Sequence, residues 1–185
     1  MSVADRARRA GLLWASRDRE GALDQLLLGI AATSRKRYPR SRVRDDRVAF
    51  IRFLEDEIRS GLFLGPHITA VNFAMPWRGK NLSLAEILYK IRCRQVHRAS
   101  LPHDVHYAAG GDPHRLVVRI DKASGQFVFQ DSLLRCLIRC IHNVPENATE
   151  LDPLPLGSFV GGGGLTSGPG GPYTITASEI DLPII

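Results

Sequence analysis

The chain has no long apolar run, few cysteines, and a final stretch of forty residues without a single basic side chain. Its apolar runs fall short of the roughly 18 residues that a membrane-spanning helix needs, so no membrane partner is expected. Met1 to Arg9 is charged and leads into no apolar stretch, which predicts no secretory signal peptide. Three cysteines, an odd number without small-domain spacing, indicate a reducing cytoplasm rather than a disulfide framework.

The net charge of +6 conceals an asymmetry, because the C-terminal end of the chain contains no basic residues. All 25 Lys and Arg lie in residues 1–145 beside 14 Asp and Glu, whereas residues 146–185 hold five acids. The first part therefore carries +11 and the second −5, against +6 overall. A basic body favours a polyanionic partner such as RNA, DNA or an acidic protein, although an Arg-rich solvated surface has the same composition.

The acidic end also differs in the residues that break regular structure. Five of the 11 prolines lie in residues 151–185, and Gly161–Gly164 is an uninterrupted glycine run. That run lacks the Lys and Ser/Thr that complete a phosphate-binding P-loop. We therefore expect one domain over residues 1–145 and a flexible Gly/Pro-rich tail over 146–185, with at most a short strand at 174–177.

Apolar periodicity predicts a mainly helical domain. One helix is expected from Asp18 to Tyr38, ending before Pro39. Others are expected from Asp45 or Asp46 to about Gly61, from a Ser83/Glu86 capping box to His97, and from an Asp131 or Ser132 cap to before Pro145. Residues 62–81 are expected to be irregular, with an aromatic plug at 72–77. Residues 116–129 read as a hairpin that leans on the helices.

The segment from Tyr89 to His97 carries the chemistry that stands out. An arginine fork matches phosphate oxygens, and a histidine transfers protons near neutral pH. RNA is cut without metal when a base takes the 2′-hydroxyl proton and a cation stabilises the charged phosphorane. Five helical residues rotate by about 500°, which leaves Arg92 and His97 roughly 140° apart, while Arg94 is only about 60° from His97.

Convergence of Arg92 and His97 thus needs a frayed helix end, a long reach by Arg92, or a second chain. Arg94 is the nearer partner of His97 on helical geometry alone. The plainer interpretation is that these positive side chains only complete a helix C-terminus, where they suit the helix dipole.

A second basic cluster carries six positive charges in residues 35–44. We expect Arg35, Lys36 and Arg37 to contact RNA phosphates, with a solvated charged loop as the alternative. Tyr38 would offer one stacking surface for a base.

Two groups have spacings that occur in metal sites, but neither is complete. His103, Asp104 and His106 lack supporting ligands, and Cys136 and Cys140 lack an evident fourth ligand. We expect the two cysteines to be buried thiols of a helical core, and we expect no metal and no cofactor.

The stretch Leu88-Tyr89-Lys90-Ile91-Arg92-Cys93-Arg94-Gln95-Val96-His97 resembles the signature of HEPN-domain proteins, all-helical domains many of which are RNases. Their motif is an Arg, roughly four to six residues and a His at the end of a late helix. Arg92 and His97 match it, and Ser100-Leu101-Pro102 resembles a subgroup in which a loop and hairpin follow. Many RNases of the family have a polar residue directly after the Arg, where this chain has Cys93.

The resemblance implies a HEPN-like helical bundle with a small hairpin, and a metal-independent endoribonuclease with Arg92 and His97 as catalytic residues. Lys90, Arg94 and Arg98 would add positive charge for RNA. HEPN domains commonly dimerise, so that two motifs face one cleft. The family also suggests a toxin or defence effector restrained by an antitoxin-type protein. The alternatives are an inactive HEPN-like domain that binds RNA or a protein, and a scaffold without a nucleic-acid role.

Overall fold

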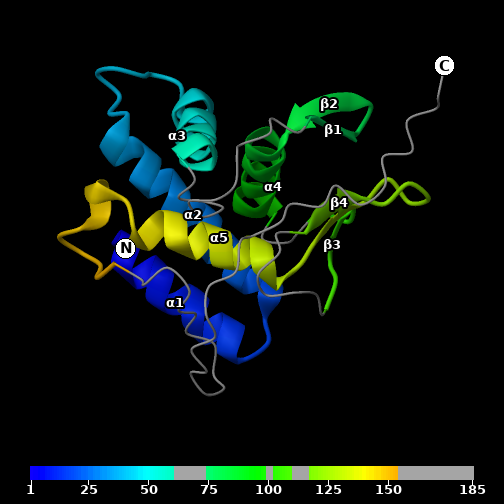
Figure 1. The fold of residues 1–185 in the computed structure, drawn as a ribbon, viewed down its shortest axis with the longest axis horizontal. Coiled ribbons are helices and arrows are strands. Elements are labelled where there is room, and N and C mark those ends of the chain that lie inside the picture. The colour runs from blue at the N-terminus through cyan, green and yellow to red at the C-terminus, as the bar shows by residue number, and fades with distance from the viewer. Residues whose placement is uncertain (61–73, 99–101, 110–116, 154–185) are drawn as a thin grey trace.

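A computed structural model describes residues 1–60, 74–98, 102–109 and 117–153, with only the backbone at Ser60, His97 and Arg98. The helices of these residues are α1 (Val3–Ala15), α2 (Arg19–Arg37), α3 (Asp46–Ser60), α4 (Leu84–Arg98) and α5 (Asp131–His142), followed by the 3₁₀ turn η1 (Pro145–Asn147). Short strands form two small sheets beside the helices (Figure 1). The domain is therefore mainly helical, as the periodicity predicts.

Helix α2 is the centre of the fold, in contact with α1, α3, α4, α5 and η1. It begins after Asp18, whose Oδ1 accepts a hydrogen bond from the backbone N of Gly21 at 2.8 Å, and it ends before Tyr38. Buried apolar residues occupy more than one side of it: Ala22, Leu23, Leu26, Leu27 and Ile30. This confirms the helix expected from 18 to 38, with a stripe wide enough to be covered by several neighbours.

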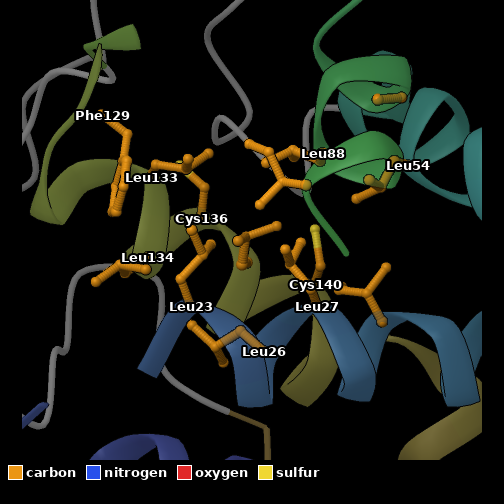
Figure 2. Packing of buried hydrophobic residues seen from close by; sticks show 14 of the residues in the cluster. Leu23, Leu26, Leu27, Leu54, Leu88, Phe129, Leu133, Leu134, Cys136 and Cys140 are labelled. Carbon is orange, nitrogen blue, oxygen red and sulfur yellow. The ribbon is translucent and has the colours of Figure 1, made fainter. Parts of the chain in front are cut away.

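The core forms where α2 meets α5 and the sheet. Leu23, Leu26 and Leu27 pack toward Leu133 and Leu134 of α5, with Leu54, Leu88 and Phe129 around them (Figure 2). Cys136 and Cys140 are free and buried in this cluster, and burial raises the pKa of the Cys136 thiol to about 12. The expectation of buried core thiols is confirmed for both.

Helix α1 was not expected, because arginines interrupt its apolar pattern and most of its buried side chains are small. Ser2 and Asp5 form a capping box, with the backbone N of Asp5 donating to Ser2 Oγ at 3.0 Å. The buried face consists of Val3, Ala7, Ala10 and Trp14. Small residues let α1 lie close against α2, which is how so polar a sequence forms a core helix.

The expected hairpin is confirmed: β4 (Val118–Ile120) pairs antiparallel with β5 (Phe127–Phe129). A third strand, β3 (Val105–Tyr107), pairs in parallel with the other edge of β5, which local patterns did not indicate.

The expectation of irregular structure up to residue 81 is wrong for its second half. There β1 (Ala74–Trp77) and β2 (Lys80–Ser83) form a hairpin around Arg78 and Gly79, whose φ values of 53° and 69° suit a tight turn. Trp77 is fully buried, with its ring 6.3 Å from that of Phe127, so the aromatic plug is confirmed for this residue. Residues 61–73 lie outside the described part of the chain.

The start of α4 is as predicted and the start of α5 is not. The backbone N of Ser83 donates to Glu86 Oε2 at 3.0 Å, and the backbone N of Glu86 donates to Ser83 Oγ at 3.2 Å. Gln130 rather than Asp131 or Ser132 precedes α5, and its side chain makes no capping bond. Asp131 instead accepts hydrogen bonds from Arg19 and the Tyr107 hydroxyl, which ties α5 to α2 and β3.

The folded unit continues past residue 145, where we expected the tail to begin. Asn147 is fully buried, and its Nδ2 donates to Thr33 Oγ1 at 2.9 Å and to the Ile141 carbonyl at 2.8 Å. The first residues of the acidic segment thus belong to the packed domain. The glycine run and the strand expected at 174–177 lie outside the described residues.

Candidate nucleic-acid interface at the end of helix α4

Helices α3 and α4 run side by side in the same direction. Arg47 pairs with Glu86 at 3.3 Å near their starts, and the rings of Phe50 and Tyr89 lie 5.6 Å apart one turn later. Burial of Ala85, Leu88, Ile91 and Gln95 fixes the face that α4 turns toward the core. The predicted Arg92–His97 segment therefore occupies the last turns of a helix that is anchored along its length.

Arg92 is half-buried against aromatic rings. The centre of its guanidinium lies 5.8 Å from the Phe50 ring and 5.9 Å from the Tyr89 ring. Its Nε is buried, and none of the described residues accepts a hydrogen bond from it. Within the same residues, no carboxylate forms an ion pair with Arg92. The guanidinium is thus positioned by two rings, and its Nε donor is not used by the described residues.

His97 and Arg98 lie in the last turn of α4, and their side chains are outside the described part of the structure. The helix continues without interruption through Arg98, so fraying does not bring position 97 round to Arg92. The angle between the two positions stays at roughly 140°. Of the three ways in which Arg92 and His97 could come together, two remain: contact with a second chain, or a long reach by the Arg92 side chain.

Lys90 and Arg94 are half-buried on α4, and neither forms an ion pair with any carboxylate of the described residues. The nearby Val96 has 56% of its surface exposed, a large fraction for an apolar side chain. Val96 stands one turn after Arg92 and was not singled out by sequence reasoning. The signal that could have identified Val96 is an apolar residue at a helix position where the periodicity predicts an exposed polar side chain.

Cys93, the residue that departs from the HEPN pattern, is a half-buried thiol that interacts with Tyr89. Burial, followed by the hydrogen bond with Cys93, raises the pKa of Tyr89 to about 12. The Tyr89 hydroxyl therefore stays protonated at neutral pH and is not a base for this site.

The second predicted RNA contact, Arg35-Lys36-Arg37 at the end of α2, is engaged within the protein. Arg37 Nη1 donates to Glu57 Oε1 at 2.5 Å and its Nε donates to Glu146 Oε1 at 2.6 Å. The guanidinium holds the pKa of Glu146 below its ordinary value, whereas burial raises the pKa of Glu57 despite the pairing.

Lys36 and Arg35 are engaged in the same way. Lys36 Nζ donates to Asn147 Oδ1 at 2.8 Å and to Glu150 Oε1 at 2.5 Å. Arg35 forms an ion pair with Asp46 and donates to backbone carbonyls of the following loop. RNA binding by these three residues stays a prediction, but each would have to exchange an internal partner for a phosphate.

The histidine-rich loop has a structural role in the described residues. Arg78 donates to both carboxylate oxygens of Asp104 at 2.5 Å, which joins the β1–β2 hairpin to the loop before β3 and lowers the pKa of Asp104. His103 and His106 are exposed on either side. Across the described ranges, no group of three or more His, Cys, Asp or Glu is arranged to hold a metal ion.

Fold and site together define a mainly helical domain with two small sheets and a basic helix end that forms no ion pair with the described residues after its first turn. The chain belongs to the Rv1289 family, whose family model matches residues 2–153. Neither the curated proteins nor the solved structures contain a significant match to it. Nothing in the family match links the chain to HEPN domains. In the part of the chain that the structure describes, no helix has both the length and the apolar character to cross a membrane.

Proposed function

We propose that this chain is a HEPN-like, metal-independent endoribonuclease that acts at the C-terminal end of α4. The observation that carries the proposal is the state of Arg92, which is held by two aromatic rings and has no carboxylate partner among the described residues. A guanidinium kept in place without a carboxylate is suited to take a phosphate. Lys90, Arg94 and Arg98 add positive charge on the same helix.

In the proposed reaction, His97 takes the proton of an RNA 2′-hydroxyl. The 2′-oxygen then forms a bond to the adjacent phosphorus while the bond from phosphorus to the 5′-oxygen breaks. The protonated His97 gives this proton to the leaving 5′-oxygen, so the products are a 2′,3′-cyclic phosphate and a 5′-hydroxyl. Arg92 stabilises the additional negative charge on the phosphorane oxygens.

The site is proposed to assemble from two copies of the chain. An uninterrupted helix leaves Arg92 and His97 on different faces, so one α4 cannot supply both groups to one phosphate by backbone position alone. Two α4 ends that face each other bring Arg92 of one copy toward His97 of the other. The exposed Val96, one turn after Arg92, supplies apolar surface for such a contact.

The test is cleavage of a labelled single-stranded RNA by the purified chain in the presence of a chelator. Arg92→Ala and His97→Ala should each reduce the cleavage rate by about a hundredfold or more, the usual contribution of a proton-transfer or charge-stabilising group. Arg9→Ala, an exposed arginine on α1, is the matched control and should cleave normally. Equal cleavage by wild type and both α4 variants would show that the catalytic assignment is wrong.

Mixing the two inactive variants tests the composite site. If Arg92 and His97 act across the dimer, a mixed dimer has one intact site, and random mixing restores about a quarter of the wild-type rate. If each chain uses its own pair, mixing restores nothing. Should Arg94→Ala rather than Arg92→Ala remove cleavage, Arg94 takes the role of the phosphate-binding residue.

The second candidate is an inactive HEPN-like domain that binds RNA or a protein partner. Cys93 favours it, because a thiol interacting with Tyr89 follows Arg92 where many RNases of that family have a polar residue. RNA binding without cleavage would select this candidate. A role as a toxin or defence effector restrained by an antitoxin-type protein rests on the resemblance alone, and growth arrest that depends on His97 when the chain is expressed would support it.

A further inference from the structure

The loop between α2 and α3 is held in shape by the side chain of Arg35 and by backbone hydrogen bonds. Arg35 Nη1 donates to the carbonyl oxygens of Tyr38 at 3.1 Å and Val43 at 2.5 Å, and its Nη2 donates to the Arg44 carbonyl at 3.2 Å. Turn hydrogen bonds from the backbone N of Arg42 and Val43 to the Pro39 carbonyl, at 2.8 and 3.0 Å, close the loop further. Residues 39–44 therefore form a defined turn.

This turn directs three arginines into solvent: Arg40, Arg42 and Arg44. The side chain of Arg40 is 78% exposed, with its Nη2 3.6 Å from Asp46. Within the described residues, neither Arg42 nor Arg44 forms an ion pair with a carboxylate. The ten-residue basic cluster thus divides into residues 35–37, which pair with carboxylates of the domain, and the arginine loop of residues 40, 42 and 44, which faces solvent.

We propose that the arginine loop binds the phosphate backbone of single-stranded RNA, away from the end of α4. Guanidinium groups match phosphate oxygens in a two-pronged geometry, and a preformed loop loses little freedom when it binds. The choice of RNA as the polyanion rests on the proposed function, while the division of the cluster does not.

The composition of the loop surface favours nucleic acid over an acidic protein. Its exposed residues are arginines and Ser41, and the large apolar side chains that are exposed among the described residues, Met1, Leu12 and Val96, belong to α1 and α4 or precede them. Protein interfaces have an apolar centre, whereas nucleic-acid interfaces are polar and positively charged. Tyr38 donates its hydroxyl to Asp56, so it offers no free polar end to a base. The loop is therefore assigned to the backbone and not to base sequence.

The location of the loop separates it from the proposed cleavage site. It immediately precedes α3, and α3 runs alongside α4 from the Arg47–Glu86 pair onward (Figure 1). The C-terminal end of α4 is then about 20 Å away, the length of a helix of its size. Arg92 lies nearer to the loop, because its guanidinium is 5.8 Å from the ring of Phe50 at the beginning of α3. RNA bound to the arginine loop would therefore pass Arg92 and span several nucleotides before it reached the end of α4.

The experiment compares two triple variants that remove the same charge. Arg40→Gln/Arg42→Gln/Arg44→Gln removes the loop, and Arg8→Gln/Arg9→Gln/Arg17→Gln removes exposed arginines of α1 and the turn after it. Affinity for a short fluorescent single-stranded RNA is measured by anisotropy over a range of salt, with thermal unfolding as the check on folding. The loop variant should bind on the order of tenfold more weakly at low salt, and the slope of log K against log salt should be smaller by about 2, the value for three lost phosphate contacts. The α1 variant should keep the wild-type slope.

Arg35→Lys provides a variant with unchanged charge. A lysine keeps the positive charge but lacks the fork that reaches three carbonyls, so the loop should lose its shape and RNA affinity should fall several-fold. Wild-type affinity in Arg35→Lys would overturn the role of the preformed loop.

Three results would overturn the proposal as a whole: an unchanged salt slope in the loop variant, equal losses in both triple variants, or polyglutamate binding as tightly as RNA with the same dependence on the loop. The last would identify an acidic protein as the partner. Loop-dependent RNA binding without any cleavage would contradict the proposed nuclease and leave the loop assignment intact. Cleavage by the loop variant at the wild-type kcat/KM would contradict the loop assignment and leave the proposed nuclease intact.

Discussion

The ends of α2 and α4 have similar charge and opposite surroundings. Arg35, Lys36 and Arg37 at the end of α2 pair with four carboxylates from three other segments, those of Asp46, Glu57, Glu146 and Glu150. Lys90, Arg92 and Arg94 near the end of α4 pair with none in the described part of the chain. The first end joins parts of the domain, and the second is where we propose that RNA binds.

The largest expected difference between the two ends is in RNA cleavage. Arg92→Lys should lower kcat/KM by about a hundredfold, because an ammonium cannot bind two phosphate oxygens as a guanidinium does. Lys36→Arg at the end of α2 should leave kcat/KM unchanged. Steady-state cleavage of one RNA by both variants measures this, and equal effects would remove the distinction between the two ends.

The next largest effect is on the free energy of unfolding. Arg37→Met removes the ion pairs with Glu146 and with Glu57, whose side chain is only 5% exposed, and should destabilise the fold by about 3 kcal/mol. Arg94→Met, which breaks no ion pair in the described residues, should cost less than about 1 kcal/mol. Urea unfolding of the two variants gives the comparison. If Arg37→Met is no less stable than Arg94→Met, the ion pairs at the end of α2 do not stabilise the fold.

Acid should weaken the ion pair between Arg37 and Glu146 at the end of α2. Because Arg37 lowers the pKa of Glu146 in the folded state, this pair stabilises the fold above the ordinary pKa of 4.5 and is lost as the pH falls through the lower folded value. Burial raises the pKa of Glu57, so its contribution changes in the opposite direction. We therefore expect the Tm to fall on acidification below about pH 4.5 and to fall less in Glu146→Gln. A Tm that falls equally in wild type and Glu146→Gln would contradict the assignment.

The smallest effect concerns the ion pair between Lys36 and Glu150. The side chains of Lys36 and Glu150 are 32% and 30% exposed, so solvent screens their attraction. A double-mutant cycle with Lys36→Met and Glu150→Gln should give a coupling below about 1 kcal/mol. A larger value would mean that this pair is as important as Arg37.

Sequence patterns predicted the elements whose signals are local. The Ser83/Glu86 capping box, the helix between Asp18 and Tyr38, and the turn between β4 and β5 each depend on residues a few positions apart. Strand β3 was missed because it pairs with a strand 22 positions later, as Val105 does with Phe127. Helix α1 was missed because half of its buried positions are alanines, whose burial depends on a close neighbour.

The candidate site shows the same division. The place of Arg92 and His97 near the end of a late helix followed from the period of α4. The engagement of Lys36 and Arg37 did not, since Glu150 and Glu146 lie 114 and 109 positions away. A run of basic residues in the sequence indicates positive charge. Only the folded structure shows whether carboxylates already pair with that charge.

The buried Asn147 has a consequence for how the domain is made. Thr33, Lys36 and Arg37 each have a hydrogen-bond partner among residues 146–150, near the end of the folded unit. During synthesis, the N-terminal helices therefore leave the ribosome long before the segment that completes them. Until residues 146–150 emerge, Lys36 lacks its carboxylate partner Glu150, and Arg37 has only Glu57 of the two carboxylates with which it pairs in the folded domain. We therefore expect the packing around the end of α2 to be completed late in translation, and a chain that ends at residue 145 to lack these contacts.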